Sequence, residues 1–175
     1  MRKMDAKIET ATFKLLDRLY EIEKQSFRNE AFSKRQIRYL LRDYNAISLV
    51  ARVDGEIVAF AIGRMECEAE VQYGHIFTVE TVSAFRRKGI AQKLLRGLED
   101  VFAKRGATES RLEVREDNFF AISLYQKLGY DRVGKIDGYY GNVPGLYFKK
   151  NIVVKDTCPG ASTSQKTNPY PKSST

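Results

Sequence analysis

Hydrophobic and polar residues follow one another along the chain in a pattern that predicts both strands and helices. Residues 6–11 alternate weakly, as a strand does, and residues 12–27 repeat apolar positions every three residues, as a helix does. The apolar positions of this helix are Phe13, Leu16, Leu19 and Ile22. The first elements of the chain are therefore a strand and a helix.

A second helix follows after a short break in the pattern. Ser33 and Gln36 have the spacing of a capping box, in which each side chain binds the backbone of the other residue at a helix start. The apolar residues of this helix are Ile37, Leu40 and Leu41. After it, residues 46–53 and 56–64 predict two strands joined by Asp54-Gly55, a strong hairpin signal.

The middle of the chain predicts a loop, a strand and a long helix. The acidic segment 65–72 reads as a loop, and residues 73–82 are rich in the aromatic and β-branched residues that favour strands. Residues 90–105 carry one continuous apolar face, and Gly106 is placed to end that helix.

The last elements alternate again between strand and helix. Residues 110–116 predict a strand, residues 117–130 predict a helix that ends at Gly129, and 131–136 and 145–152 predict two closing strands. The apolar stripe of the helix consists of Ile122, Tyr125 and Leu128. The whole order, β-α-α-β-β-β-α-β-α-β-β, predicts a mixed α/β domain with helices packed over a mostly antiparallel sheet.

Length and composition set the class of protein without selecting a function. The chain has 175 residues, of which 43% are hydrophobic, and we expect one domain over residues 1–154 and a disordered tail rich in Ser, Thr, Pro and Lys over 155–175. Cys67 and Cys158 lack the spacing of a zinc site or disulfide framework, which fits a reducing compartment. With no apolar leader or membrane-length segment, we expect a cytoplasmic protein without a bound metal.

Charge gives the first hint of a partner. The net charge is +8 and the isoelectric point is near 9.4, which suits an anionic partner such as nucleic acid, a membrane surface or a phosphorylated ligand. Arg86, Arg87 and Lys88 stand with Gly89 just before the long helix. This segment is either a solvated basic turn or a site where free amide groups at a helix start bind an anion.

Several motifs in order resemble one family. The segments "RRKGIAQKLL", "LEVREDNFFAISLYQKLGY" and "GYY" resemble the GCN5-related N-acetyltransferase superfamily, and within it the RimI-like branch that acetylates the N-terminal amines of proteins. The resemblance covers about residues 46–148 and implies the GNAT fold, with acetyl-CoA as the acetyl donor.

The resemblance implies which residues bind the cofactor. In the family, a loop of the form Q/R-x-x-G-x-G/A grips the pyrophosphate of acetyl-CoA through backbone amides, and Arg86 occupies its leading position. The implied pyrophosphate contacts are Arg87, Lys88, Gly89, Ile90, Ala91 and Gln92. The pantetheine arm would pair like an extra strand with Val79, Glu80 and Thr81, and Asn118, which also reads as a helix cap, would hydrogen-bond the same arm.

The resemblance also implies a pair of catalytic residues. Glu113 reads as a paired surface acid by itself, but in the RimI-like pattern it is the general base for the acceptor amine. An α-amino group has a pKa near 8 and lysine one near 10.4, so an N-terminal amine is easier to deprotonate. Tyr125 alone would read as a core aromatic residue, and the resemblance makes it the acid that protonates the leaving thiolate.

The acceptor site transfers least well from the family. Tyr139 and Tyr140 match paired tyrosines that line the peptide groove, although they also read as an aromatic cluster of a hairpin. Residues from the loop after the first helix, including Phe27 and Glu30, would complete the groove. "VET" at 79–81 replaces the family's aliphatic triplet, and "GNVPGLY" replaces an acidic hairpin.

Two residues stay outside the implied machinery. Glu80 is either a second base or a residue that faces solvent, and we favour solvent because the sequence shows no partner for it. His75 matches a "GHI" found in eukaryotic and archaeal relatives, but a lone histidine in a strand is more often structural.

We expect an acetyl-CoA-dependent Nα-acetyltransferase acting on proteins, including ribosomal ones. A small-molecule amine acetyltransferase, such as one for polyamines, is the alternative that Glu66, Glu68 and Glu70 keep open. A basic nucleic-acid-binding module would explain the charge, but the basic residues are dispersed and no nucleic-acid-binding motif is present.

Overall fold

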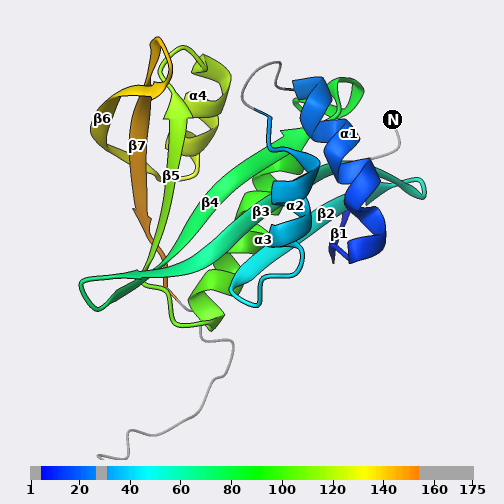
Figure 1. Ribbon diagram of the computed structural model, residues 1–175, viewed down its shortest axis with the longest axis horizontal. Helices are drawn as coiled ribbons and strands as arrows, with labels where there is room; N and C mark the ends of the chain where they lie inside the picture. The colour runs from blue at the N-terminus through cyan, green and yellow to red at the C-terminus, as the bar shows by residue number, and fades with distance from the viewer. Residues whose placement is uncertain (1–4, 27–30, 154–175) are drawn as a thin grey trace, which may run out of the picture.

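A computed structural model of the chain describes residues 5–26 and 31–153 (Figure 1). The expected tail at 155–175, with Cys158, and the acceptor candidates Phe27 and Glu30 lie outside the described residues. The elements are β1 (Lys7–Thr10), η1 (Phe13–Leu15), α1 (Leu16–Ser26), α2 (Lys34–Leu40), β2 (Ala46–Val53), β3 (Glu56–Glu68), β4 (Val71–Thr81), η2 (Ser83–Phe85), α3 (Ile90–Lys104), β5 (Glu109–Arg115), α4 (Phe119–Lys127), β6 (Asp131–Tyr140) and β7 (Val143–Asn151).

One seven-stranded sheet, in the order β1-β2-β3-β4-β5-β7-β6, organises the fold. The β4 and β5 strands pair in parallel, and every other neighbouring pair is antiparallel. The expected mixed α/β fold with a mostly antiparallel sheet is therefore confirmed. The single parallel pair arises because the chain crosses over through α3 between β4 and β5.

Helices cover both faces of the sheet and create two cores. In Figure 1, α1 and α2 lie in front of β2 to β4, and α3 lies behind them. The core on the α1 and α2 side is built around Leu19, Ile22, Ile37 and Phe60. The core on the α3 side includes Leu94, Leu98, Phe102, Leu112 and Phe148. The apolar faces of α1, α2 and α3 are thus buried against the sheet.

Local signals at the helix ends behave as the sequence predicts. Ser33 and Gln36 form a complete capping box at α2, and Asn118 caps α4 by accepting a hydrogen bond from the amide of Ala121 at 3.2 Å. The glycines after α3 and α4, Gly106 and Gly129, have φ values of 94° and 88°. These left-handed conformations end both helices without the steric penalty of a side chain.

Phe13 departs from the predicted helical stripe. It lies in the 3-10 turn η1 before α1, is 42% exposed, and has the guanidinium of Arg42 at 4.5 Å from its ring centroid. The helix itself begins at Leu16, so the apolar spacing of three continues one turn beyond the helix.

The predicted acidic loop at 65–72 is wrong. Strand β3 runs on to Glu68 and β4 starts at Val71, so only Ala69 and Glu70 connect them, both with positive φ. The acids are accommodated in the strand because cross-strand partners bind them. Tyr73 donates a hydrogen bond to Glu66 at 2.9 Å, and Arg111 donates one to Glu68 at 2.6 Å.

The final hairpin is also longer than predicted. Strand β6 extends to Tyr140 and β7 starts at Val143, with Gly141 at a φ of 66° in the turn between them. The segment "GNVPGLY" therefore contributes a tight turn and the start of a strand. Tyr139 and Tyr140 lie at the end of β6.

Two glycines make room for the largest side chain between α3 and the sheet. Phe102 is fully buried, and a Cβ built on Gly74 would lie 2.0 Å from its ring, while one on Gly63 would lie 2.5 Å from it. Both glycines therefore let β3 and β4 approach α3 closely, because a side chain there would overlap the ring.

We predict that Gly74→Ala lowers the free energy of unfolding by about 2 kcal/mol, since overpacking a dense core costs about 1–3 kcal/mol. Urea unfolding followed by circular dichroism measures the change. Gly134→Ala is the control, because its added Cβ would make an ordinary contact of 3.7 Å with Tyr147. Equal stability of the two variants would contradict this account of the packing.

Candidate functional site

The two parallel strands at the centre of the sheet separate. Strands β4 and β5 pair only from Tyr73 with Glu109 to Ile76 with Leu112. Beyond that point β5 continues to pair with β7, and β4 continues to pair with β3. The β4 edge over residues 77–81 therefore has no strand beside it among the described residues, and every second residue turns its N–H and C=O groups toward the opening.

A bulge in β4 changes which of its later side chains point to each face of the sheet. The register with β3 shifts between Ile62 and Gly63, which leaves Phe77 as the extra residue. Past this bulge, Thr78 contacts α1, whereas Val79 packs against the core on the α3 side. The end of β4 thus offers one face to the α1 side and the other to the α3 side.

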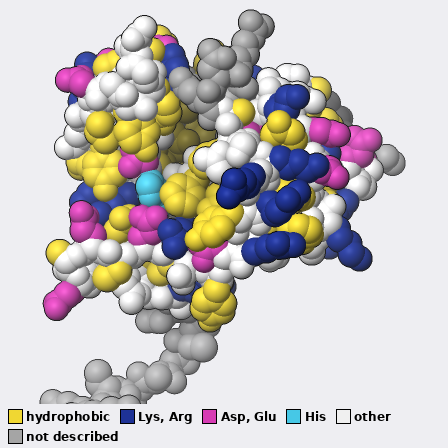
Figure 2. All heavy atoms as spheres, viewed as in Figure 1, with side chains coloured by type: hydrophobic (Ala, Val, Ile, Leu, Met, Phe, Trp, Pro, Cys, Tyr) yellow, Lys and Arg dark blue, Asp and Glu magenta, His cyan; other side chains and the backbone are white. Residues whose placement is uncertain are grey.

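The opening between β4 and β5 contains a cavity of about 240 Å³. Its lining brings together seven of the residues singled out in the sequence: Val79, Glu80, Glu113, Asn118, Tyr125, Tyr139 and Tyr140. Glu23, Phe32, Phe77 and Thr78 also line it. In Figure 2 the hollow is bordered by hydrophobic side chains, with the histidine and acidic side chains beside it.

Glu113 is paired inside the site. Its Oε2 lies 2.7 Å from Nε2 of His75, the single histidine of the chain. Burial lowers the pKa of His75, but the hydrogen bond and charge of Glu113, together with Glu66, outweigh it and raise that pKa overall. His75, which the sequence left as a structural residue, is therefore in direct contact with the predicted base.

Tyr139 is a second neighbour of Glu113 in the cavity lining. Burial and the neighbouring Glu113, with which it shares a hydrogen bond, raise the pKa of Tyr139 to about 12. Its ring meets that of Tyr140 edge to face, with centroids 4.8 Å apart. The paired tyrosines form a wall of the cavity, and their role in binding the acceptor stays a prediction.

Tyr125 reaches the cavity from α4. Burial and the Glu80 carboxylate raise the pKa of the Tyr125 phenol above its ordinary value. A phenol with such a pKa keeps its proton at neutral pH, which is the state that a proton donor needs.

The expectation that Glu80 faces solvent is wrong. Glu80 is only 8% exposed and turns toward α1, where it hydrogen-bonds Ser26 and lies near Glu23. Burial, opposed by the Ser26 hydrogen bond and supported by the charge of Glu23, raises the pKa of Glu80 to about 7. The bulge at Phe77 determines which face of the sheet the Glu80 side chain points to. The sequence gives no sign of this bulge, so the buried position of Glu80 could not be predicted.

Glu23 is a site residue that the sequence analysis missed. It is fully buried in α1 and accepts hydrogen bonds from the amide of Phe32 and the hydroxyl of Thr78, both at 3.0 Å. The sequence holds a weak signal for this burial, because Glu23 follows Ile22 on the helix face that the apolar pattern predicts to be buried. Burial raises the pKa of Glu23, as it does that of Glu80, so these two acids of the lining favour the neutral form more than an exposed acid does.

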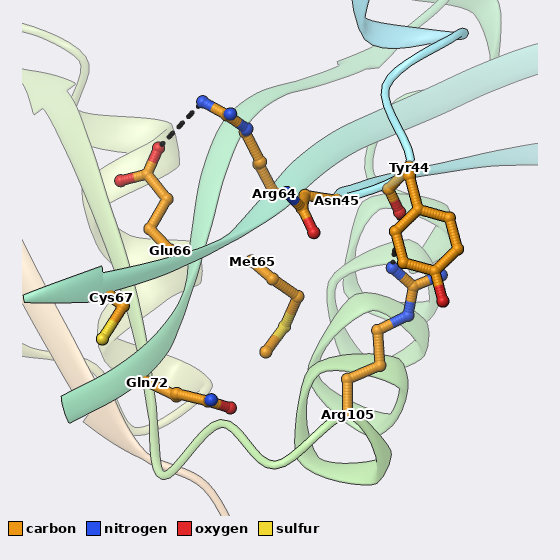
Figure 3. Close-up of a pocket in the computed structure, with 8 residues that line it drawn as sticks. All are labelled: Tyr44, Asn45, Arg64, Met65, Glu66, Cys67, Gln72 and Arg105. Carbon is orange, nitrogen blue, oxygen red and sulfur yellow. Dashed lines mark hydrogen bonds and ion pairs between the residues drawn. The ribbon is translucent and has the colours of Figure 1, made fainter. Parts of the chain in front are cut away.

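The acids that kept a polyamine acceptor open lie elsewhere. Glu68 pairs with Arg111, and Glu70 lies in the turn between β3 and β4. Glu66 lines a different hollow of about 750 Å³ with Tyr44, Asn45, Arg64, Met65, Cys67, Gln72 and Arg105 (Figure 3). This larger hollow contains no predicted catalytic residue.

The basic turn has the backbone shape expected of an anion site. Arg87 and Gly89 have φ values of 62° and 78°, and α3 starts directly after Gly89. Alternating left-handed and ordinary conformations turn successive N–H groups to one side, and the first amides of a helix lack partners inside it. Among the residues that the structure describes, no side chain caps α3, so none of them occupies these donors as a cap.

Two cations of the turn, Arg86 and Lys88, have different surroundings. Arg86 donates a hydrogen bond to the carbonyl of Thr81 at 3.0 Å and so ties the turn to the end of β4. The Lys88 ammonium lies 5.2 Å from the centroid of Phe85. Other basic side chains gather over α1 and α2 on the face shown in Figure 2.

Comparison with known proteins decides the family. The model of the Acetyltransferase (GNAT) family matches residues 16–130. The chain belongs to this family. It is an acetyl-CoA-dependent N-acetyltransferase, and acetyl-CoA is its cosubstrate.

Relatives of this GNAT protein include N-alpha-acetyltransferases. That of Saccharolobus solfataricus is 33% identical over 116 residues, which cover 61% of this chain and 70% of the relative. That of Sulfolobus acidocaldarius is 28% identical over 158 residues, covering 83% and 92%. N-alpha-acetyltransferase 20 of Dictyostelium discoideum is 32% identical over 118 residues, covering 66% and 68%.

Solved GNAT structures share the fold. The ribosomal-protein-S18-alanine N-acetyltransferase of Escherichia coli has a TM-score of 0.74 and 22% identity, covering 90% of this chain and all of that one. Ard1 of Thermoplasma volcanium has a TM-score of 0.75 and 24% identity, covering 86% and 99%. The predicted superfamily, its RimI-like branch and the fold are confirmed.

Residues 5–26 and 31–153 contain no cluster of three or more His, Cys, Asp or Glu that could hold a metal ion. Within the same ranges, no helix is long and apolar enough to cross a membrane.

We predict that Gly89→Val raises the KM for acetyl-CoA about tenfold or more, equivalent to ~1.4 kcal/mol, because a β-branched residue disfavours the left-handed backbone of the turn. Steady-state kinetics with acetyl-CoA as the varied substrate measure this. The control is Gly55→Val, since Gly55 has a φ of 88° and open space around it in a distant turn. A normal KM in Gly89→Val would remove the turn from cofactor binding.

We predict that Glu80→Gln stabilises the protein at pH 8 and gives little gain at pH 5. A carboxyl whose pKa rises from 4.5 unfolded to about 7 folded loses stability as pH rises through that window. The glutamine stays neutral, so the gain at pH 8 is on the order of 2 kcal/mol relative to pH 5.

Thermal unfolding at both pH values tests this, with the same substitution at the exposed Glu56, Glu56→Gln, as the control. A Glu80→Gln effect that is independent of pH would show that Glu80 is not held in a raised-pKa environment.

Proposed function

We propose that this enzyme acetylates the N-terminal α-amino group of proteins, including ribosomal proteins, in the cytoplasm. One observation carries the proposal: Glu113, Tyr125 and the paired tyrosines line the same cavity, beside the free edge of β4. The N-alpha-acetyltransferases among the relatives support the choice of acceptor.

In the proposed complex, acetyl-CoA lies along the opening between β4 and β5. The free edge at Val79, Glu80 and Thr81 receives the pantetheine amides as an added strand would, and Asn118 faces the same arm. The amides of Arg87 to Gln92 bind the pyrophosphate. The Thr81 hydroxyl, buried and without a hydrogen-bond partner among the described residues, is a further polar group at this strand end.

Proton transfers in the proposed reaction are divided between the two sides of the cavity. Glu113, on β5, takes a proton from the acceptor ammonium, directly or through water, so that the neutral nitrogen attacks the thioester carbonyl. A backbone N–H of the free β4 edge stabilises the oxyanion. Tyr125, on α4, gives its proton to the departing thiolate, so no covalent enzyme intermediate forms.

The acceptor enters from the α1 side of the sheet. Tyr139, Tyr140 and Phe32 form apolar walls, and Phe27 and Glu30 stay predictions for the same groove. Acidic side chains, Glu23, Glu80 and Glu113, line the same groove and suit a cationic amine to the extent that they are ionised. The same acidic lining favours a small-molecule amine, such as a polyamine, as the second candidate acceptor.

A panel of acceptors separates these candidates. We predict acetyl-CoA-dependent thiol release with peptides that carry a free N-terminus, and much slower release with N-terminally blocked lysine peptides. Faster turnover of polyamines than of any peptide would transfer the proposal to the second candidate.

We predict that Glu113→Gln lowers kcat by about 10²–10⁴, the usual contribution of a general base, and flattens its rise with pH. Binding of acetyl-CoA, measured by calorimetry, stays normal. Glu116→Gln is the control, because that nearby acid pairs with Lys135 and does not line the cavity.

Tyr125→Phe is expected to lower kcat without a comparable change in the acid side of the pH profile.

If Glu113→Gln and Glu116→Gln behave alike, Glu113 is not the base.

A further inference from the structure

Glu80 is a buried acid in the wall of the proposed acceptor groove. It lies on β4 beside the free edge, is 8% exposed, and lines the cavity between β4 and β5. The resemblance to the GNAT family implies an aliphatic residue at this position, so the carboxyl group is a feature of this chain. A buried acid is costly unless it is fully hydrogen-bonded, and such acids gather at functional sites.

The backbone and the side chain of Glu80 serve different parts of the site. In a strand, the N–H and C=O groups lie in the plane of the sheet, whereas side chains point above or below it. The Glu80 side chain leaves the sheet on the α1 side, where it hydrogen-bonds Ser26, the last residue of α1. Thr78, two residues earlier, points to the same side and contacts Glu23. A change of the Glu80 side chain therefore leaves the free edge available for the cofactor.

The two acids on the α1 side differ in how far the protein itself satisfies them. Glu23 accepts a hydrogen bond from the amide of Phe32 at one oxygen and from the hydroxyl of Thr78 at the other, both at 3.0 Å. Among the residues that the structure describes, the hydrogen-bond donor to Glu80 is the Ser26 hydroxyl. A carboxylate has about four acceptor positions, so Glu80 keeps acceptor capacity on the wall of the cavity.

Glu80 lies where the first residue of an acceptor would pass. Its charge raises the pKa of Tyr125, because the carboxyl group lies near the proposed acid across the opening. In the proposed mechanism, the acceptor amine meets the thioester between Glu113 and Tyr125 and approaches from the α1 side. The first side chain is attached to the carbon that carries this amine, so it comes to lie on the Glu80 side of the groove.

We propose that Glu80 selects the first residue of the acceptor, because its carboxyl group accepts a hydrogen bond from a donor side chain and disfavours an apolar one. The inference rests on the proposed function, since it needs a protein N-terminus as the acceptor. A carboxyl oxygen accepts a hydrogen bond in either protonation state, so the preference does not require an ionised Glu80. An apolar side chain in the same place removes water from the carboxyl group and returns no hydrogen bond.

Two acceptor peptides that differ only in their first residue, Thr or Val, measure the preference. The two side chains have nearly the same shape, and a hydroxyl in one replaces a methyl group in the other. A pocket that hydrogen-bonds a substrate hydroxyl rejects the analogue without it more strongly than an apolar pocket rejects a change in size. We expect kcat/KM of the wild-type protein to be about tenfold or more higher for the Thr peptide.

Substitution of Glu80 separates its role from other contributions to the preference. We expect Glu80→Leu to abolish or reverse the preference for Thr, since the pocket then matches the methyl group. Glu80→Gln keeps an oxygen acceptor in the same shape and retains part of the preference, so it tests the proposal even where Glu80→Leu does not fold. Glu56→Leu is the control, because Glu56 is an exposed acid at the start of β3 and keeps the wild-type ratio.

The ratio of the two peptides distinguishes selection from a merely structural role. A variant with a damaged fold acetylates both peptides more slowly and leaves their ratio unchanged, and the KM for acetyl-CoA reports whether the cofactor site is intact. Equal kcat/KM for the two peptides in the wild-type protein would overturn the proposal, as would a Thr preference that Glu80→Leu retains in full. Failure of the proposed function gives a different result, in which neither peptide is acetylated while a polyamine is, and this inference then falls with it.

Discussion

The separation of β4 from β5 is the structural feature on which the site depends. Two parallel strands that stayed paired to their ends would fill the centre of the sheet and leave no free edge. Here the pairing ends at Ile76 and Leu112 because β5 turns away with β7 while β4 continues with β3. The same separation opens the cavity and exposes the backbone groups of residues 77–81. It also places the α3 start, with its left-handed turn, close to that edge through the contact of Arg86 with Thr81.

The two sides of the opening carry different ionisable groups. On the β5 side, Glu113 contacts Nε2 of His75, and Nδ1 of the same ring contacts Glu66, which lines a second hollow. On the α4 side, burial beside Glu80 keeps the Tyr125 phenol protonated. In the proposed mechanism the base is a carboxylate and the acid is a phenol, so the reaction needs no unusual residue type.

Much of the fold follows from the sequence because apolar periodicity and capping residues act locally. The capping box at Ser33 and the glycine after α3 fix helix ends whatever the tertiary context. The predictions are wrong where contacts between residues distant in sequence determine the structure. The acids of 65–72 form strand only because Tyr73 and Arg111 are brought beside them, and Glu80 turns inward only because β4 bulges at Phe77. Glu113 and Tyr125 could be named from the family motif, whereas the His75 and Glu66 contacts depend on strand register.

The most direct test of the account is hydrogen exchange at the β4 edge with and without acetyl-CoA. If pantetheine pairs with the free edge and pyrophosphate binds the turn, acetyl-CoA slows exchange of backbone amides within residues 77–81 and 89–92 together. Amides of β2, on the far side of β3, keep their rates. Saturating acetyl-CoA that leaves both segments unchanged would contradict the claim that the opening between β4 and β5 is the cofactor site.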